Sequence, residues 1–131
     1  MNLTDRPIYQ KTPKEAKTRK PMRQFSEKRA KQRASREGKR GQEYMRQVKQ
    51  LPCCICGKSG PSDAHHVFHD RYGNHKASDF DTIPLCKGHH LDGPEAIHNG
   101  KQTWREKHGP DHSYIKSTRL RIDPRYWPKV L

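Results

Sequence analysis

The cysteines of this 131-residue chain fall into two pairs whose spacing is typical of zinc ligands. Cys53 and Cys56 form a Cys-x2-Cys pair, and Cys86 and His89 form a Cys-x2-His pair 30 residues later. Three thiolates and one imidazole complete the tetrahedral ligand set of a structural zinc ion. Four free, buried cysteines are the alternative, but they do not account for two correctly spaced pairs. We therefore expect a structural zinc site, with Cys54 as a surplus thiol.

The histidines that are not zinc ligands indicate a second site. The chain has nine histidines, and zinc uses one of them. The doublet His65-His66 falls between the two zinc pairs, and His90 directly follows a zinc ligand. A structural zinc module needs none of these three. The more isolated histidines are expected to be ordinary surface or core residues: His69, His75, His108 and His112.

The combined pattern resembles the HNH endonucleases, the ββα-metal nucleases, in their zinc-stapled form. The matching elements are Cys53-x2-Cys56, the doublet, and Pro84-Leu85-Cys86-x2-His89-His90, within about residues 51–109. The later residues 96–100 and 104–109 make the chain most similar to the phage recombination-enhancement nucleases, the Ref family. Members of that family carry a basic, flexible N-terminal arm and cut DNA coated by the RecA recombinase.

The resemblance implies a role for each histidine of the second site. His65 would bind the catalytic metal, His66 would be the general base that activates water, and His90 would be a second ligand. The family often places a further ligand four residues after His90, where this chain has Pro94. A helix cannot run unbroken through that proline, so the role moves to His98, as in the Ref-like branch. We expect Mg²⁺ or Mn²⁺ in this site, although imidazoles also accept zinc, nickel or cobalt.

The family's asparagine before the second zinc pair is replaced by an aspartate, Asp81. We expect Asp81 to orient His66 by accepting a hydrogen bond, or to help hold the metal through water. A plain carboxylate at a strand edge is the alternative, and Asp79 is a competitor for the same role.

The expected fold class is α+β, a small zinc-stapled ββα-metal (HNH) module. Two short strands are predicted at residues 63–67 and 80–85, with a helix beginning near Cys86. A helix over residues 103–107 would pack Trp104 on the zinc core and stop at Gly109-Pro110. The module would span residues 51–112, and the C-terminal extension 113–131 could add a strand at residues 115–122.

Residues 1–50 are expected to form a basic, largely disordered or conditionally helical arm, with a solvated helix over residues 26–40. They hold 16 of the 28 lysines and arginines, while the whole chain has a net charge of +14. Their apolar residues follow no sustained helical or strand period. Such an arm suits nucleic acid or a partner protein, the alternative being a solvated tail.

Composition narrows the function further. Only 29% of residues are hydrophobic, and neither a membrane span nor a secretory signal is evident, so a cytoplasmic location is expected, in a bacterial host if the chain is phage-encoded. The leading hypothesis is a metal-dependent DNA endonuclease with a single-metal, His-general-base mechanism, acting on RecA-coated DNA in recombination. Its rivals are a non-catalytic zinc-binding nucleic-acid module and a small RNA- or ribosome-associated protein. The sequence does not separate DNA from RNA.

Overall fold

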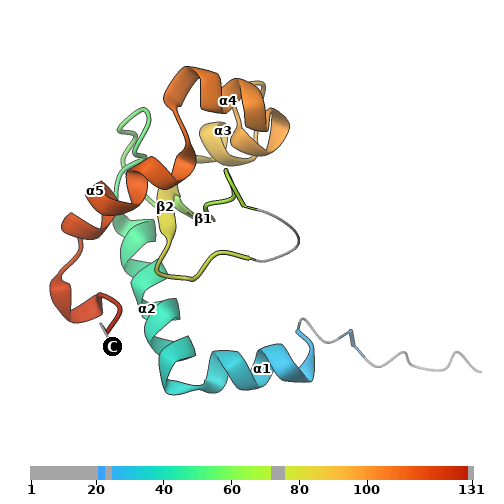
Figure 1. Ribbon diagram of the computed structural model, residues 1–131, viewed down its shortest axis with the longest axis vertical. Helices are drawn as coiled ribbons and strands as arrows, with labels where there is room; N and C mark the ends of the chain where they lie inside the picture. The colour runs from blue at the N-terminus through green and yellow to red at the C-terminus, as the bar shows by residue number, and fades with distance from the viewer. Residues whose placement is uncertain (1–20, 23–24, 72–75, 130–131) are drawn as a thin grey trace, which may run out of the picture.

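The protein is a small α+β structure, described by a computed structural model at residues 21–22, 25–71 and 76–129 (Figure 1). No helix in these ranges is long and apolar enough to cross a membrane. The elements follow in the order α1 (Glu27–Ala34), α2 (Arg36–Gln50), β1 (Asp63–His66), β2 (Thr82–Leu85), α3 (Lys87–His90), α4 (Lys101–His108) and α5 (Ile115–Leu120). Three short 3-10 turns occur at Ile97–Asn99, Asp111–Tyr114 and Pro124–Tyr126.

Helices α1 and α2 meet at a sharp elbow made by one residue, Ser35 (Figure 1). Its backbone is extended, and its N–H donates to the carbonyls of Lys31 and Gln32 at the end of α1. Its hydroxyl accepts the N–H of Gly38 at 3.1 Å and so caps the start of α2. One serine therefore ends the first helix and begins the second.

Helix α2 belongs to the folded body of the protein. Its Tyr44 and Val48 are fully buried and pack with Phe80 and Ile122 in one of two apolar clusters. The rings of Tyr44 and Phe80 lie 5.3 Å apart. The expected largely disordered arm is therefore wrong for α2, because a short stripe at Gly41, Tyr44 and Val48 anchors an otherwise very basic helix. Helix α1 has no buried residue and falls within the solvated helix predicted over residues 26–40. Most of the remaining arm, residues 1–20 and 23–24, lies outside the described residues.

The two strands form one antiparallel sheet, in which His65 lies opposite Ile83 and His66 opposite Thr82. The predicted strands are confirmed to within two residues at each end. All four residues of β2 are buried, whereas His65 is the one buried residue of β1. The sheet separates the cluster around α2 from a second apolar cluster, which consists of Cys53, Val67, Ala77, Ile83, Leu85, Ile97 and Trp104.

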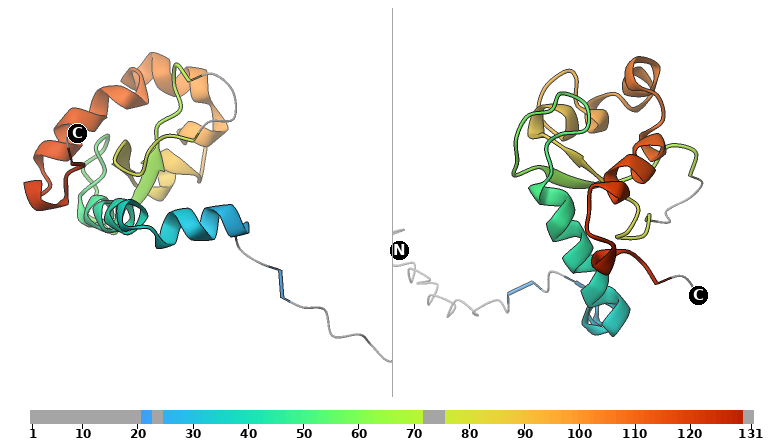
Figure 2. Two further views of the ribbon diagram at one scale, coloured as in Figure 1. Left: turned by 60° about the horizontal axis from the view of Figure 1, so that its bottom comes forward. Right: turned by 90° about the vertical axis from the view of Figure 1, so that its left-hand side faces the viewer.

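Helices α3 and α4 lie at the end of the molecule opposite α1 (Figures 1 and 2). Helix α3 begins after Cys86 as predicted, but it lasts one turn, and the chain becomes helical again only at Ile97. Trp104 is buried, and α4 stops at Gly109, whose φ is 81°. The expected strand at residues 115–122 is wrong. That segment forms α5, because Ile115, Thr118 and Ile122 recur at helical spacing and are the ones turned inward.

Candidate metal centres and their neighbouring carboxylates

The four predicted zinc ligands converge on one point. The ligand atoms of Cys53, Cys56, Cys86 and His89 all lie within 4.8 Å of one another. The Sγ atoms of Cys56 and Cys86 are 3.7 Å apart, and Nδ1 of His89 lies 3.1 Å from Sγ of Cys86. Ligands about 2.3 Å from a tetrahedral zinc ion would be separated by about 3.8 Å. The cluster can therefore hold a structural metal such as zinc.

Two tight turns bring these ligands together. In the first turn, the N–H of Gly57 donates to the carbonyl of Cys53 at 2.9 Å, with Gly57 at a φ of 72°. The N–H of Cys54 donates to the carbonyl of Pro84 at 3.0 Å, which ties this turn to β2. Burial raises the pKa of the Cys54 thiol to about 12. Cys54 is therefore a protonated, packed side chain beside the cluster.

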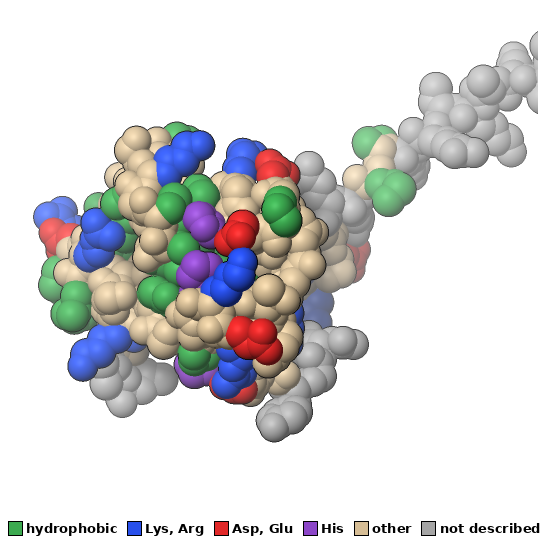
Figure 3. Space-filling view, turned by 90° about the horizontal axis from the view of Figure 1, so that it is seen from above, with side chains coloured by type: hydrophobic (Ala, Val, Ile, Leu, Met, Phe, Trp, Pro, Cys, Tyr) green, Lys and Arg blue, Asp and Glu red, His purple; other side chains and the backbone are tan. Residues whose placement is uncertain are grey.

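Three further histidines form a second cluster, in which His65, His90 and His98 offer ligand atoms within 4.8 Å of one another. The Nε2 atoms of His90 and His98 are 3.2 Å apart. Two nitrogens each about 2.1 Å from a shared ion would be separated by about 3.0–3.4 Å. His65 is 1% exposed, whereas His98 is exposed. Figure 3 shows histidine side chains at the surface in the view from above. Because His98 is exposed, the cluster is open to solvent on one side.

Carboxylates behind two of these histidines decide which ring nitrogen is free. Nδ1 of His90 lies 2.9 Å from Asp63, and Nε2 of His65 lies 3.0 Å from Asp111. A carboxylate can only accept, so each of these nitrogens carries the proton. Nε2 of His90 and Nδ1 of His65 keep their lone pairs for a metal ion. Such carboxylate partners commonly fix histidine ligands in metal sites.

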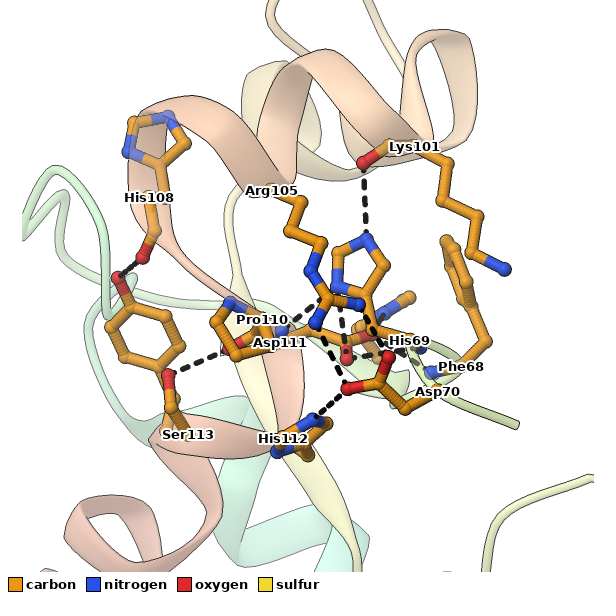
Figure 4. A network of polar contacts seen from close by, with 12 residues as sticks. Phe68, His69, Asp70, Lys101, Arg105, His108, Pro110, Asp111, His112 and Ser113 are labelled. Carbon is orange, nitrogen blue, oxygen red and sulfur yellow. Dashed lines mark hydrogen bonds and ion pairs between the residues drawn. The ribbon is translucent and has the colours of Figure 1, made fainter.

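Asp111 is the centre of a buried network (Figure 4). It is 0% exposed and accepts the backbone N–H groups of Phe68 at 2.8 Å and His69 at 3.2 Å. Its own N–H donates to Nδ1 of His69 at 2.9 Å, and Nε2 of that ring donates to the carbonyl of Lys101. Burial would raise the pKa of Asp111, but the bonds from His65 and the backbone hold it below its ordinary value. Asp111 therefore remains a charged acceptor.

The same network explains His69, which is a satisfied core residue as expected. Burial lowers the pKa of His65, although the bond to Asp111 opposes that change. The His65 ring is therefore held in its neutral form. His112 is exposed and bonded to Asp70 at 2.8 Å, while His75 lies outside the described residues.

His66 is paired with Asp79 and not with Asp81. Its Nε2 lies 2.9 Å from Oδ1 of Asp79, whereas Asp81 faces Arg119 at 3.4 Å. The expected hydrogen bond from His66 to Asp81 is therefore wrong. A turn closed by the Asp81 N–H and the Ser78 carbonyl, at 2.9 Å, directs the two carboxylates apart. Asp79, which the sequence analysis named as the alternative to Asp81, is the carboxylate that lies beside His66.

The surroundings of His66 keep the ring neutral. Burial lowers its pKa, and the nearby positive charges of Lys76 and Arg29 lower it further, against the effect of Asp79. Because Nε2 donates to Asp79, Nδ1 holds the free lone pair. The ring can therefore accept a proton at Nδ1 at neutral pH.

A third group shares one residue with the zinc cluster. His89, Glu95 and His108 offer ligand atoms within 4.8 Å of one another. Nδ1 of His89 also faces the thiols of Cys53 at 3.9 Å and Cys86 at 3.1 Å. Glu95 also accepts from Lys107 at 2.9 Å. Sequence reasoning missed Asp63, Glu95 and Asp111, since nothing in their local spacing marks them.

One family model matches residues 12–121, a segment that contains every ligand of both clusters, His66 and Asp79. That family is described as a protein of unknown function, DUF968. No curated protein and no solved structure matches the chain. Because the match covers most of its length, the chain belongs to the DUF968 family.

Proposed function

We propose that this protein is a metal-dependent DNA endonuclease of the HNH type. The observation that carries the proposal is the convergence of His65, His90 and His98 beside a zinc cluster that uses none of them. A purely structural zinc module has no need of a second set of ligands that is open on one side. The order β1, β2, α3, with the doublet on β1 and His90 on α3, agrees with the HNH pattern.

His66 would act as the general base in this reaction. Its Nδ1 would take a proton from water as the water oxygen bonds to phosphorus and the bond to the leaving oxygen breaks. Asp79 would hold the ring in place through Nε2 and stabilise the charge that the ring gains. His66 is neutral beforehand because its pKa is lowered, so the base form is available at neutral pH.

The three-histidine cluster would hold one divalent cation, which we propose to be Mg²⁺ or Mn²⁺. When bound, the cation supplies positive charge for the phosphate oxygens and the leaving oxygen. His65 and His90 would bind it with rings already oriented by Asp111 and Asp63. The Cys53, Cys56, Cys86 and His89 cluster would hold zinc and take no part in the chemistry.

The test is a plasmid-nicking assay on the full chain, with Mg²⁺ or Mn²⁺ added or omitted. His66→Ala should lower the cleavage rate by roughly 10²–10⁴-fold, with zinc content unchanged. The control is His112→Ala, which alters an exposed histidine that belongs to none of the three groups of candidate ligands. This variant should cleave DNA at the parent rate. Cleavage by His66→Ala at the parent rate would refute the assignment of the base.

Two further arms identify the substrate. The same assay on RecA-coated DNA tests the Ref-like proposal, in which cleavage is faster on the filament. RNA of matched sequence should stay intact if DNA is the substrate. A parent protein that binds DNA but cuts nothing with either metal ion would instead support the rival, a non-catalytic zinc-binding nucleic-acid module.

A further inference from the structure

A polar cleft of about 510 Å³ lies between the α1–α2 elbow and the segment that leads into β2. Helix α1 lines one side with Arg29, Gln32 and Arg33, and the opposite side carries Lys76, Ser78 and Asp79. The cleft volume is within the range of about 300–1,000 Å³ typical of ligand sites. The cleft is thus formed jointly by the α1–α2 elbow and residues 76–80.

The cations of the cleft differ in how they are held. The Arg33 guanidinium lies over the Phe25 ring and donates to Gln42 at 3.3 Å. Among the described residues, neither Arg29 nor Lys76 forms an ion pair. The lining also includes two carboxylates, Glu37 and Asp79, and Asp79 is already bonded to His66. Two cations are thus available to an anionic ligand.

The cleft lies next to the pair formed by Asp79 and His66. Asp79 lines the cleft and is hydrogen-bonded to His66 at 2.9 Å, so the cleft lies one residue away from the candidate base. Helix α2 touches Asp79 directly, since a Cβ added at Gly41 would lie 2.9 Å from the Asp79 Cβ. A strand whose phosphate is attacked beside His66 would place a neighbouring phosphate within reach of the cleft.

We propose that this cleft binds the phosphodiester backbone of the DNA strand beside the bond that is cut, with Arg29 and Lys76 contacting phosphate. This inference rests on the proposed endonuclease function. A guanidinium presents paired N–H donors that match phosphate oxygens, and a lysine adds a compact positive charge. The Gln32 amide and the Ser78 hydroxyl add neutral donors on the two sides.

The experiment measures binding separately from cleavage. Fluorescence anisotropy with a labelled DNA duplex, at several salt concentrations and without added Mg²⁺ or Mn²⁺, compares the parent with Arg29→Ala/Lys76→Ala. Removing the two cations that neutralise phosphates should flatten the slope of log affinity against log salt by about 1.8 and weaken binding at low salt. The conservative pair Arg29→Lys/Lys76→Arg should keep the parent slope.

A matched control removes the same charge elsewhere. Lys116→Ala/Arg121→Ala alters two exposed cations on or just after α5, outside the cleft. Circular dichroism and zinc content verify that each variant is folded. An unchanged slope in Arg29→Ala/Lys76→Ala, or an equal loss in the control, overturns the cleft proposal. If the cleft variant alone loses affinity while the parent cuts nothing, the cleft is upheld and the endonuclease proposal fails.

Discussion

His65 is oriented by a carboxylate that lies 46 residues further along the chain. Asp111 holds Nε2 of the ring and, through its other bonds, fixes the backbone that follows β1. Asp63 plays the same part for His90, but from a partly exposed position. Each carboxylate thereby selects the nitrogen that its histidine offers to the cluster.

Asp111→Asn should weaken the binding of Mn²⁺ to the three-histidine cluster by about 10–100-fold. An asparagine has one acceptor oxygen in place of two, so its NH2 group must face either the His69 N–H or the Oδ2 side, where His65 Nε2 and the Phe68 N–H both donate. The measurement is Mn²⁺ titration by calorimetry, with zinc content determined in parallel. Because Asp111 is buried, the variant should also lose about 1–3 kcal/mol of unfolding free energy.

Asp63→Asn provides the same test on a partly exposed residue, where loss of the fold is not a concern. It should weaken Mn²⁺ binding through His90 while the unfolding free energy changes little. Unchanged Mn²⁺ affinity in both variants would show that these carboxylates do not position the ligands.

The cysteines give a second prediction at this scale. The segments that carry the four ligands are a tight turn and the single-turn helix α3, which buries none of its residues, so zinc should contribute much of their stability. Cys86→Ser should therefore unfold this region, whereas Cys54→Ser, which changes a thiol outside the cluster, should leave the fold and zinc content intact. Circular dichroism and zinc analysis check both. A Cys86→Ser protein that matches the parent in both measurements would contradict the ligand set.

At the scale of the elements, α2 determines where Asp79 lies. Gly41 is buried against that residue, and a Cβ there would lie 2.9 Å from both Cβ and Oδ2 of Asp79. Only a residue without a side chain allows the helix to approach so closely. The helix therefore supports the pair formed by Asp79 and His66 from behind.

Gly41→Ala separates two opposing effects. Alanine favours a helix over glycine by about 1 kcal/mol, so helix propensity alone would stabilise the protein. The contact with Asp79 should outweigh this gain, lowering the unfolding free energy by about 1–3 kcal/mol and slowing cleavage as Asp79 moves from His66. Chemical denaturation and the nicking assay provide the two readouts.

The control is Lys39→Ala, on an exposed position of the same helix, which should leave the cleavage rate unchanged. A Gly41→Ala protein that is stabilised and fully active would contradict the packing argument.

Local patterns predicted the elements whose causes are local. The two Cys-x2 turns, the paired strands and the glycine that ends α4 each depend on residues within a few positions of one another. The packing of α2 was missed because three inward positions are hidden among many charges. The partners Asp63 and Asp111 were missed for another reason. Their hydrogen bonds join residues 27 and 46 positions apart, and only the folded chain brings these together.

At the scale of the whole molecule, the boundary between arm and body lies earlier than charge alone indicates. Ser26 caps α1 by accepting the N–H of Arg29 at 3.2 Å, so the first helix of the described residues begins just after it. Removing residues 1–50 would also remove Tyr44 and Val48 from the core, at a cost of about 2–5 kcal/mol for each large side chain removed. A test of the arm must therefore stop before residue 26.

Deletion of residues 1–25 should leave the fold and both metal clusters intact while removing seven of the 28 lysines and arginines. If these residues bind DNA, the slope of log affinity against log salt should flatten by about 0.9 for each duplex phosphate that the arm no longer neutralises. Cleavage at saturating DNA should persist, because His66, the three-histidine cluster and the cleft at the elbow are retained.

If the arm binds a RecA filament instead, the slope on naked DNA should stay constant while cleavage of filament-coated DNA falls. Anisotropy on naked DNA and nicking on both substrates distinguish these cases, and a deletion that changes none of them identifies a solvated tail.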